Sequence, residues 1–179
     1  MIQDWKKEIA VGWLVKQAMM ELDKHKVFPY HLPEVAASES QILEAERQIG
    51  HTLDASYKAF LRHANGWQSF WQTSDLFGTD DLIRGKRKDN GEFSLSMLDE
   101  GVIAKCKFKR QDLLPISVTP FDRDVFVITR PNSPSPGIVI WFAGEEVERF
   151  LTFDDYFLAM VEYGRQNIQW LKDHQQSNT

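Results

Sequence analysis

The sequence predicts a single α+β domain in which helices pack on a central, twisted, mostly antiparallel sheet. Helical periodicity occurs at both ends of the chain, and several short apolar segments of strand length follow one another in between. A length of 179 residues with 42% hydrophobic residues is enough for one ample core. We divide the chain into an N-terminal helix with a proline-containing linker at 1–37, a main domain at 38–172 and a polar tail at 173–179.

Residues 1–26 are predicted to form an amphipathic helix. Apolar residues such as Trp5, Ile9 and Trp13 recur at helical spacing, and the charges around them are of both signs. Mixed charge favours packing on a protein core over lying on a membrane surface, and that core could belong to the same domain or to a second copy. The linker at 28–33 contains two prolines, which prevent regular structure, and we expect its aromatic residues to hold it against the domain.

Two helices in a tight hairpin are expected next. Ser38 can cap the first helix, and Gln41, three residues later, can complete a capping box. Ile42 and Ala45 belong to the apolar stripe of this helix, and Gly50 is placed to end it in a left-handed conformation.

The second helix of the hairpin is predicted to begin near Asp54, whose charge suits a helix N-terminus. Asn65–Gly66 is a turn signal that ends it, and an aromatic strand follows. Phe70 and Trp71 point to opposite faces of such a strand, so one of them could be exposed beside Asp75 as a binding hot spot, although core packing is the default for aromatic residues. The apolar face of the helix comprises Tyr57, Phe60, Leu61 and Ala64.

The middle of the chain is its most polar part. We expect a short strand at 75–78 and then loop, with at most a short helix, over 79–91. Within this segment Asn90–Gly91 is a turn signal, and the basic triplet at 86–88 is interpreted as solvated loop. Apolar and basic residues alternate over 102–109, which predicts a half-buried strand with a basic outer face.

The last third is predicted to complete the sheet. A strand at 113–118 contains a proline, which favours an edge or irregular position. The apolar segments 125–129 and 138–142 are expected to pair as a hairpin, followed by a closing strand at 147–151. Thr152 is then placed to cap a long C-terminal helix.

Charge and cysteine content exclude several classes of function. A formal net charge of −5 argues against non-specific binding to nucleic acid or to an anionic membrane, and it permits a basic partner. Cys106 is the only cysteine, so the fold does not depend on an oxidising compartment. No signal-peptide core and no membrane-spanning segment is recognised, and we therefore expect a cytoplasmic protein.

No cofactor, metal or catalytic residue is predicted. The five histidines occur singly, and neither a nucleophile elbow nor a phosphate-binding glycine loop is present. Ser94, Ser96 and Ser117 alternate with apolar residues and are interpreted as polar faces of strands.

Acidic residues gather in three loop regions. Such pairs could serve acid–base chemistry, bind a hard cation or simply keep turns solvated. They could also form an acidic docking surface for a basic protein. The acids concerned are Asp75, Asp80 and Asp81, then Asp122 and Asp124, and finally Glu145 and Glu146.

The hairpin segment resembles the signature of the SUKH superfamily, the Smi/Knr type of domain. Asp54 stands where the family usually has proline, and 119–124 stands where a glycine-rich turn is common. The resemblance covers roughly 38–162 and consists of packing motifs, which identify a fold better than a function. The residues that produce it are Glu46, Ile49–Gly50, Leu53, Tyr57, Phe60–Leu61 and Asn65–Gly66–Trp67, with Leu114–Pro115–Ile116 and Phe153–Leu158 further on.

Bacterial members of this superfamily are largely immunity proteins, and the resemblance implies a non-enzymatic domain that binds and neutralises a toxin of the nuclease or deaminase class. We expect a basic protein partner and a monomer rather than a dimer. Three alternatives stay open: a scaffold module of cell-wall or stress signalling, a small hydrolase using Asp122 and Asp124, and a domain that binds a small ligand in the groove of its sheet. The candidate contacts are Trp71, Asp75, Asp80, Asp81, Asp122, Asp124, Glu145 and Glu146.

Overall fold

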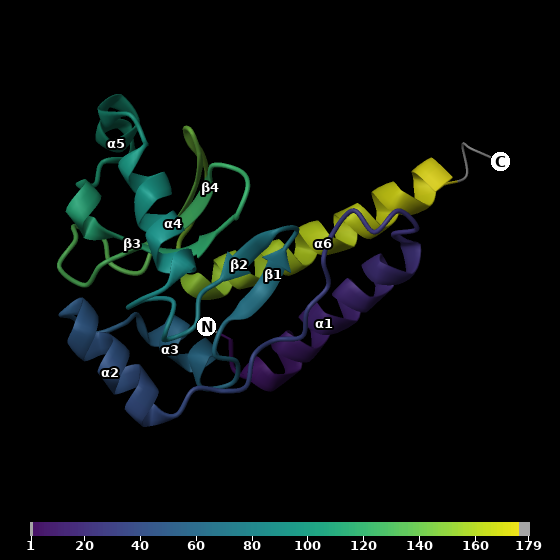
Figure 1. Cartoon of the computed structure of the whole chain (residues 1–179), viewed down its shortest axis with the longest axis horizontal. Coiled ribbons are helices and arrows are strands. Elements are labelled where there is room, and N and C mark those ends of the chain that lie inside the picture. Colours follow the sequence, from purple (N-terminus) through teal and green to yellow (C-terminus); the bar gives the residue numbers. More distant parts are fainter. Residues whose placement is uncertain (1, 176–179) are drawn as a thin grey trace.

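Six strands form one antiparallel sheet in which every strand pairs with the next along the chain (Figure 1). The computed structural model describes residues 2–175. The sheet is strongly curled, as the contact between Trp71 of the first strand and Trp141 of the fifth shows; their ring centroids are 4.9 Å apart. The predicted α+β fold with a twisted antiparallel sheet is confirmed. The strands are β1 Trp67–Trp71, β2 Ser74–Leu76, β3 Leu113–Val118, β4 Asp124–Thr129, β5 Val139–Ala143 and β6 Glu146–Phe150.

Helices cover both faces of the sheet (Figure 1). Along β4 the buried side chains alternate: Phe126 and Ile128 join the core beneath α1, α2, α3 and α6, whereas Val125 and Val127 join the core beneath α4 and α5. This alternation is what a strand buried on both faces requires. The helices are α1 Trp5–Leu22, α2 Glu39–Ile49, α3 Ala55–Leu61, α4 Lys86–Ser96, α5 Glu100–Cys106 and α6 Phe153–Gln175, with a single 3₁₀ turn at Arg110–Asp112.

The N-terminal helix packs on the domain of its own chain, a choice that the sequence left open. Helix α1 lies along α6 (Figure 1), and the Trp5 ring sits 5.1 Å from Phe157, 5.6 Å from Phe60 and 5.9 Å from Phe153. The linker is also held in place, because Trp67 Nε1 donates to the His31 carbonyl at 2.7 Å. Of the predicted tail, residues 173–175 continue α6, and 176–179 lie outside the described residues.

The predicted caps of the helical hairpin are confirmed. Ser38 and Gln41 form the capping box of α2, and Gly50 ends that helix with a φ of +78°. The Asp54 side chain accepts from two backbone N–H groups at the start of α3. Glu46 holds the connection together, because its carboxylate accepts from Leu53 N at 2.8 Å.

The loop predicted around 86–91 is wrong, since these residues form the first half of helix α4. Gly91 is not a turn residue: a Cβ there would lie 2.9 Å from Pro115 Cβ and 3.3 Å from the Phe77 ring, so glycine lets the helix approach β3 closely. The basic triplet occupies the first turn of α4, and Ser94 and Ser96 are helical too.

The strand predicted over 102–109 is also wrong, because α5 occupies most of it. Asp99 caps this helix, and Ile103 and Cys106, three residues apart, face the core while Ala104 is exposed. The helix ends at Lys107, whose φ is +66°. The segment contains two patterns: apolar residues at 103 and 106, which fit one turn of a helix, and an alternation, which fits a strand. Packing on the sheet decides between the two.

The later strands match the prediction. The register of β3 shifts between Pro115 and Ser117, which confirms an irregular strand, although β3 lies inside the sheet and not at its edge. Ser117 is buried and bonded to Ser74, 2.7 Å between hydroxyl oxygens, so it does not lie on a solvated face. Thr152 caps α6 by accepting from Asp155 N. Among the described residues, no helix is both long and apolar enough to cross a bilayer.

Candidate protein-binding site

The acidic residues of β2 and the turn after it are engaged in structure. Arg87 Nε donates to Asp75 Oδ2 at 2.8 Å, and Arg87 Nη1 donates to Asp81 Oδ2 at 3.2 Å. Asp75 also accepts from Ser69 N, and Asp81 from Gly78 N. Burial lowers the pKa of Arg87, but the two carboxylates outweigh it and leave that pKa above its ordinary value. We call these three side chains the Arg87 cluster; it ties the start of α4 to the sheet.

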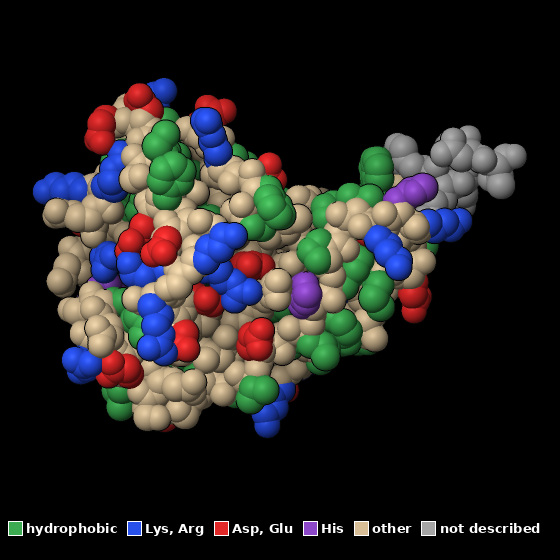
Figure 2. All heavy atoms as spheres, in the orientation of Figure 1, with side chains coloured by type: hydrophobic (Ala, Val, Ile, Leu, Met, Phe, Trp, Pro, Cys, Tyr) green, Lys and Arg blue, Asp and Glu red, His purple; other side chains and the backbone are tan. Residues whose placement is uncertain are grey.

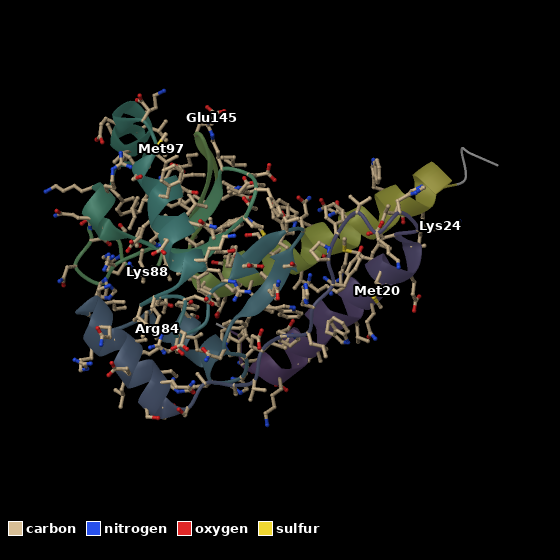
Figure 3. All side chains as sticks on the ribbon, in the orientation of Figure 1. Met20, Lys24, Arg84, Lys88, Met97 and Glu145 are labelled. Atoms are coloured by element: carbon tan, nitrogen blue, oxygen red, sulfur yellow. The ribbon has the colours of Figure 1, made fainter. Side chains whose placement is uncertain are left out.

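Asp80 and Glu146 have partners as well, but at the surface. Asp80 pairs with Arg84 at 3.0 Å, and the two side chains are 67% and 71% exposed. Figure 3 labels Arg84 on the outside of the turn before α4. Glu146 pairs with Arg149 at 2.7 Å along β6. The exposed Asp80–Arg84 pair contributes little to stability, so Asp80 can change its partner at a small cost in free energy.

A hollow of about 550 Å³ opens between the second half of α4 and the loop that joins β3 to β4. Three large apolar side chains line it and are nevertheless solvent-exposed: Phe93 by 65%, Met97 by 60% and Phe121 by 88%. Figure 2 shows hydrophobic side chains at the surface over this end of α4. We call this hollow and its three apolar residues the α4 groove. Clustered exposed apolar residues of this kind are typical of interaction sites.

The rim of the α4 groove is mainly acidic. Asp99 and Asp122 line it, and Glu145 follows the lining residue Gly144. Within the described part of the chain, none of these three carboxylates forms an ion pair. Figure 3 shows Met97 and Glu145 at the same end of the molecule. Arg123 supplies one positive charge in the lining, so acids outnumber bases.

Asp124 and Trp71 belong to a different place, the face of the sheet that carries α6. Trp141 Nε1 donates to Asp124 Oδ1 at 2.8 Å, and the Trp141 ring stacks on Phe126 with 5.3 Å between centroids. Burial raises the pKa of Asp124, and the nearby charge of Asp122 raises it further. Trp71 is half-buried in this aromatic cluster and Phe70 is buried.

The structure therefore brings only some of the predicted contacts together. Asp122 and Glu145 lie at one rim, whereas Asp75 and Asp81 are held by Arg87. Asp124 does not line the α4 groove that Asp122 lines, which does not favour a shared acid–base site. In the described residues no group of three potential metal ligands forms.

Sequence reasoning missed the apolar part of the site. Phe93 and Met97 are four residues apart and share one face of α4, a spacing that becomes informative only when the segment is recognised as a helix. The one signal in the sequence was Phe121, which lies between Pro120 and Asp122 in a loop. An aromatic residue in a polar loop is not part of an apolar helix or strand pattern, so the sequence gives no reason to place it in the core.

Comparison with known families agrees with the hairpin signature. A model described as the SMI1/KNR4 family (SUKH-1) matches residues 36–159, which include α2 to the start of α6 and every residue of the α4 groove. A search of curated proteins finds no match to the chain. The match covers well over half of the sequence. The chain belongs to the SMI1/KNR4 family (SUKH-1).

Proposed function

We propose that this chain is an immunity-type protein, a non-enzymatic domain that neutralises a toxin by binding it through the α4 groove. The observation that carries the proposal is the exposure of Phe93, Met97 and Phe121 beside carboxylates that form no ion pair with any described residue. Family membership is consistent with this role. We expect the protein to act in the cytoplasm as a monomer.

The apolar residues supply affinity in this proposal. Fully burying a Phe or Met side chain that is otherwise exposed contributes roughly 1.5–3 kcal/mol. Aromatic side chains at the centre of an interface are the usual hot spots, provided that surrounding contacts exclude water. Phe121 suits this role because it is almost fully exposed at the tip of a loop, with Phe93 across the groove.

The acidic rim supplies selectivity for a basic partner. Toxins that cleave or modify nucleic acid need positive surfaces for phosphate binding. Asp99, Asp122 and Glu145 would meet such a surface and accelerate association by long-range attraction. A partner bound in this way has its substrate-binding face covered, which explains neutralisation without catalysis.

The proposal is tested by capture followed by a toxicity assay. Tagged protein is used to isolate partners at low salt from the lysate and the secreted fraction of the source cells. Each captured basic polypeptide is then expressed in a host, alone and together with this chain. We expect the polypeptide alone to stop growth and co-expression to restore it.

Groove variants decide where binding occurs. The double substitution of Phe93→Ala with Phe121→Ala should weaken binding by at least about 30-fold, and Asp122→Lys should slow association most at low salt. Asp80→Lys is the matched control, because Asp80 is an exposed acid outside the groove. Equal protection by the groove variants and the control would contradict the site. A captured partner without toxicity would instead favour the scaffold alternative.

A further inference from the structure

The sheet ends in two edge strands, β1 and β6, and the rest of the chain engages β1. Lys16 of α1 donates its Nζ to the Ser69 carbonyl in the middle of that strand. Ser69 has a φ of +51°, which interrupts the regular strand geometry. Just before the strand, the linker residue Glu34 donates its N–H to the Gly66 carbonyl at 3.0 Å. A helix side chain, the linker and a local distortion therefore protect the β1 edge from pairing with another chain.

Backbone hydrogen bonds fix the direction in which the residues of β5 face. Thr129 of β4 donates its N–H to the Ile138 carbonyl at 2.9 Å, so Ile138 turns its backbone groups towards β4. Residues of an antiparallel strand turn alternately to one neighbour and to the other. Val139 and Trp141 therefore turn their backbone groups towards β6.

Arg149 of β6 consequently presents its backbone to the open side of the sheet. Phe150 and Glu148 lie opposite the two residues of β5 that turn towards β6, so both face β5, and Arg149 between them faces away. The register shift of this strand pair lies before Glu148 and leaves that part regular. Outside the ladder of the sheet, no residue in 2–175 bonds to the N–H or carbonyl of Arg149. Buried backbone groups without a partner are rare, which indicates that this edge faces water.

The side chains of β6 leave the edge free for another strand. Val147 and Leu151, which flank Arg149, are 48% and 74% exposed. The Arg149 guanidinium is turned back onto the domain, where Nη2 donates to Glu146 Oε2 at 2.7 Å and to the Cys106 carbonyl at 2.9 Å. β6 contains neither a lysine nor a proline, two residues that commonly protect an edge. An incoming strand would meet free backbone groups between two exposed apolar side chains.

The charge of β6 indicates which kind of strand fits. The acids Glu145, Glu146 and Glu148 lie in the strand or just before it, beside the single base Arg149. A second copy of this chain fits badly, because like charges directly opposite each other destabilise a strand pair. Symmetric antiparallel pairing centred on residue 147 or 148 would place glutamate opposite glutamate, and pairing centred on 149 would place arginine opposite arginine. A basic strand from another protein avoids this repulsion.

We propose that β6 accepts an extended, basic strand of the protein partner at the edge of the sheet. In this mode of recognition main-chain hydrogen bonds provide affinity, and alternate side chains provide specificity. Gly144 lines the α4 groove and Glu145 follows it, so the edge begins at the rim of the groove. Strand addition deepens the proposed function, on which it rests for the nature of the partner, by adding a contact through the backbone to the side-chain contacts of the groove.

A phage-displayed library of short random peptides tests the edge without a known partner. Peptides selected on the unaltered protein are compared on two variants: Arg149→Pro, which removes the outward N–H at a position where an edge strand tolerates proline, and Arg149→Ala, which keeps it. We expect the selected peptides to be rich in lysine, arginine and β-branched residues. They should bind Arg149→Pro at least about 10-fold more weakly and Arg149→Ala within about twofold of the unaltered protein.

The outcomes separate the edge from the α4 groove. Equal binding to Arg149→Pro and the unaltered protein, equal losses in both Arg149 variants, or a library without any enriched peptide would overturn the proposal. Peptides that lose binding only in the double variant of Phe93→Ala with Phe121→Ala occupy the groove, and they leave the proposed function standing while the edge fails.

Hydrogen exchange measured by NMR gives a readout that does not depend on a variant that folds. In the unaltered free protein the amide of Arg149 should exchange faster than those of Glu148 and Phe150. A selected peptide should slow the exchange of Arg149 at least about 10-fold, whereas the same peptide methylated on its backbone nitrogens should not. Unchanged exchange would overturn the proposal. Slowing that depends on protein concentration alone would overturn it too, because a second copy would then occupy the edge.

Discussion

The two ends of α4 use acidic side chains in opposite ways. At its beginning, Asp75 and Asp81 are half-buried and share the guanidinium of Arg87. At its far end, Asp122 and Glu145 are exposed and have no ion-pair partner in the described chain, beside apolar residues that are equally uncovered. Acidic side chains are therefore held by a cation within the fold at one end and exposed to solvent at the other. Burial and the presence of a local cation, rather than charge itself, separate the two roles.

Replacing Arg87, the cation of the Arg87 cluster, should have the largest effect on stability. Arg87→Ala leaves two partly buried carboxylates next to each other without a counterion, and we expect the free energy of unfolding to fall by about 2–3 kcal/mol, less than for a fully buried pair because the cluster is partly hydrated. Urea denaturation followed by tryptophan fluorescence measures it. Arg84→Ala, which removes an exposed pair of the same type, should cost less than about 0.5 kcal/mol. Similar losses for the two variants would show that the cluster is not structural.

Lys16 of α1, only 7% exposed, extends the comparison to a buried charge that forms no ion pair within residues 2–175. Because its pKa is lowered, the folded state binds fewer protons than the unfolded state between about pH 8 and 10.5, so the stability of the unaltered protein should rise with pH across that range. At pH 7, Lys16→Met should be more stable by about 1–2 kcal/mol, because the buried ammonium is removed. This advantage should shrink above pH 8. Lys24→Met, at an exposed lysine labelled in Figure 3, should show no such trend.

Asp124 sharpens the comparison because it is half-buried and forms no ion pair with the residues that the structure describes. Its pKa is raised by burial and then by Asp122, so the folded state binds protons more readily than the unfolded state and stability should increase as pH falls through that raised pKa. Asp124→Asn keeps an oxygen for Trp141 Nε1 and should stabilise the protein at pH 7 by less than about 1 kcal/mol. The gain should vanish in acid. A loss of stability at pH 7 would mean that the charge itself supports the fold.

The smallest effect on stability is expected at the α4 groove. Replacing Phe93 and Phe121 together by Ser should change the free energy of unfolding by no more than about 0.5 kcal/mol, because both side chains are already exposed. Binding to a captured partner should nevertheless be lost. A fall in stability above 1 kcal/mol would place these residues in the core and remove the basis for a docking site.

Local signals explain which parts of the fold could be predicted from the sequence. The capping box at Ser38 and the left-handed Gly50 depend on residues a few positions apart, and both were predicted correctly. Gly91 was interpreted as a turn residue, but its lack of a side chain permits a close contact with Pro115, which is distant in sequence. The strand predicted at α5 was wrong for a similar reason, since only packing on the sheet distinguishes helical spacing from alternation in that segment.

The sequence predicted acidic residues of the candidate site but not its apolar residues. Asp75 and Asp122 look alike in the sequence, and only the folded chain shows that Arg87 reaches one and not the other. Phe93 and Met97 become neighbours of Phe121 through the approach of α4 to the β3–β4 loop, a contact that no short-range pattern encodes.

The enclosure of Trp5 between helices from opposite ends of the chain has a consequence for synthesis on the ribosome. The Trp5 ring contacts Phe153 and Phe157, which are synthesised about 150 residues after it. At roughly 5–20 residues per second, this aromatic cluster stays incomplete for about 8–30 s of translation. Throughout that interval the nascent chain can cover Trp5 only in part, through Phe60, and this part of the core is completed only after the start of α6 has been made.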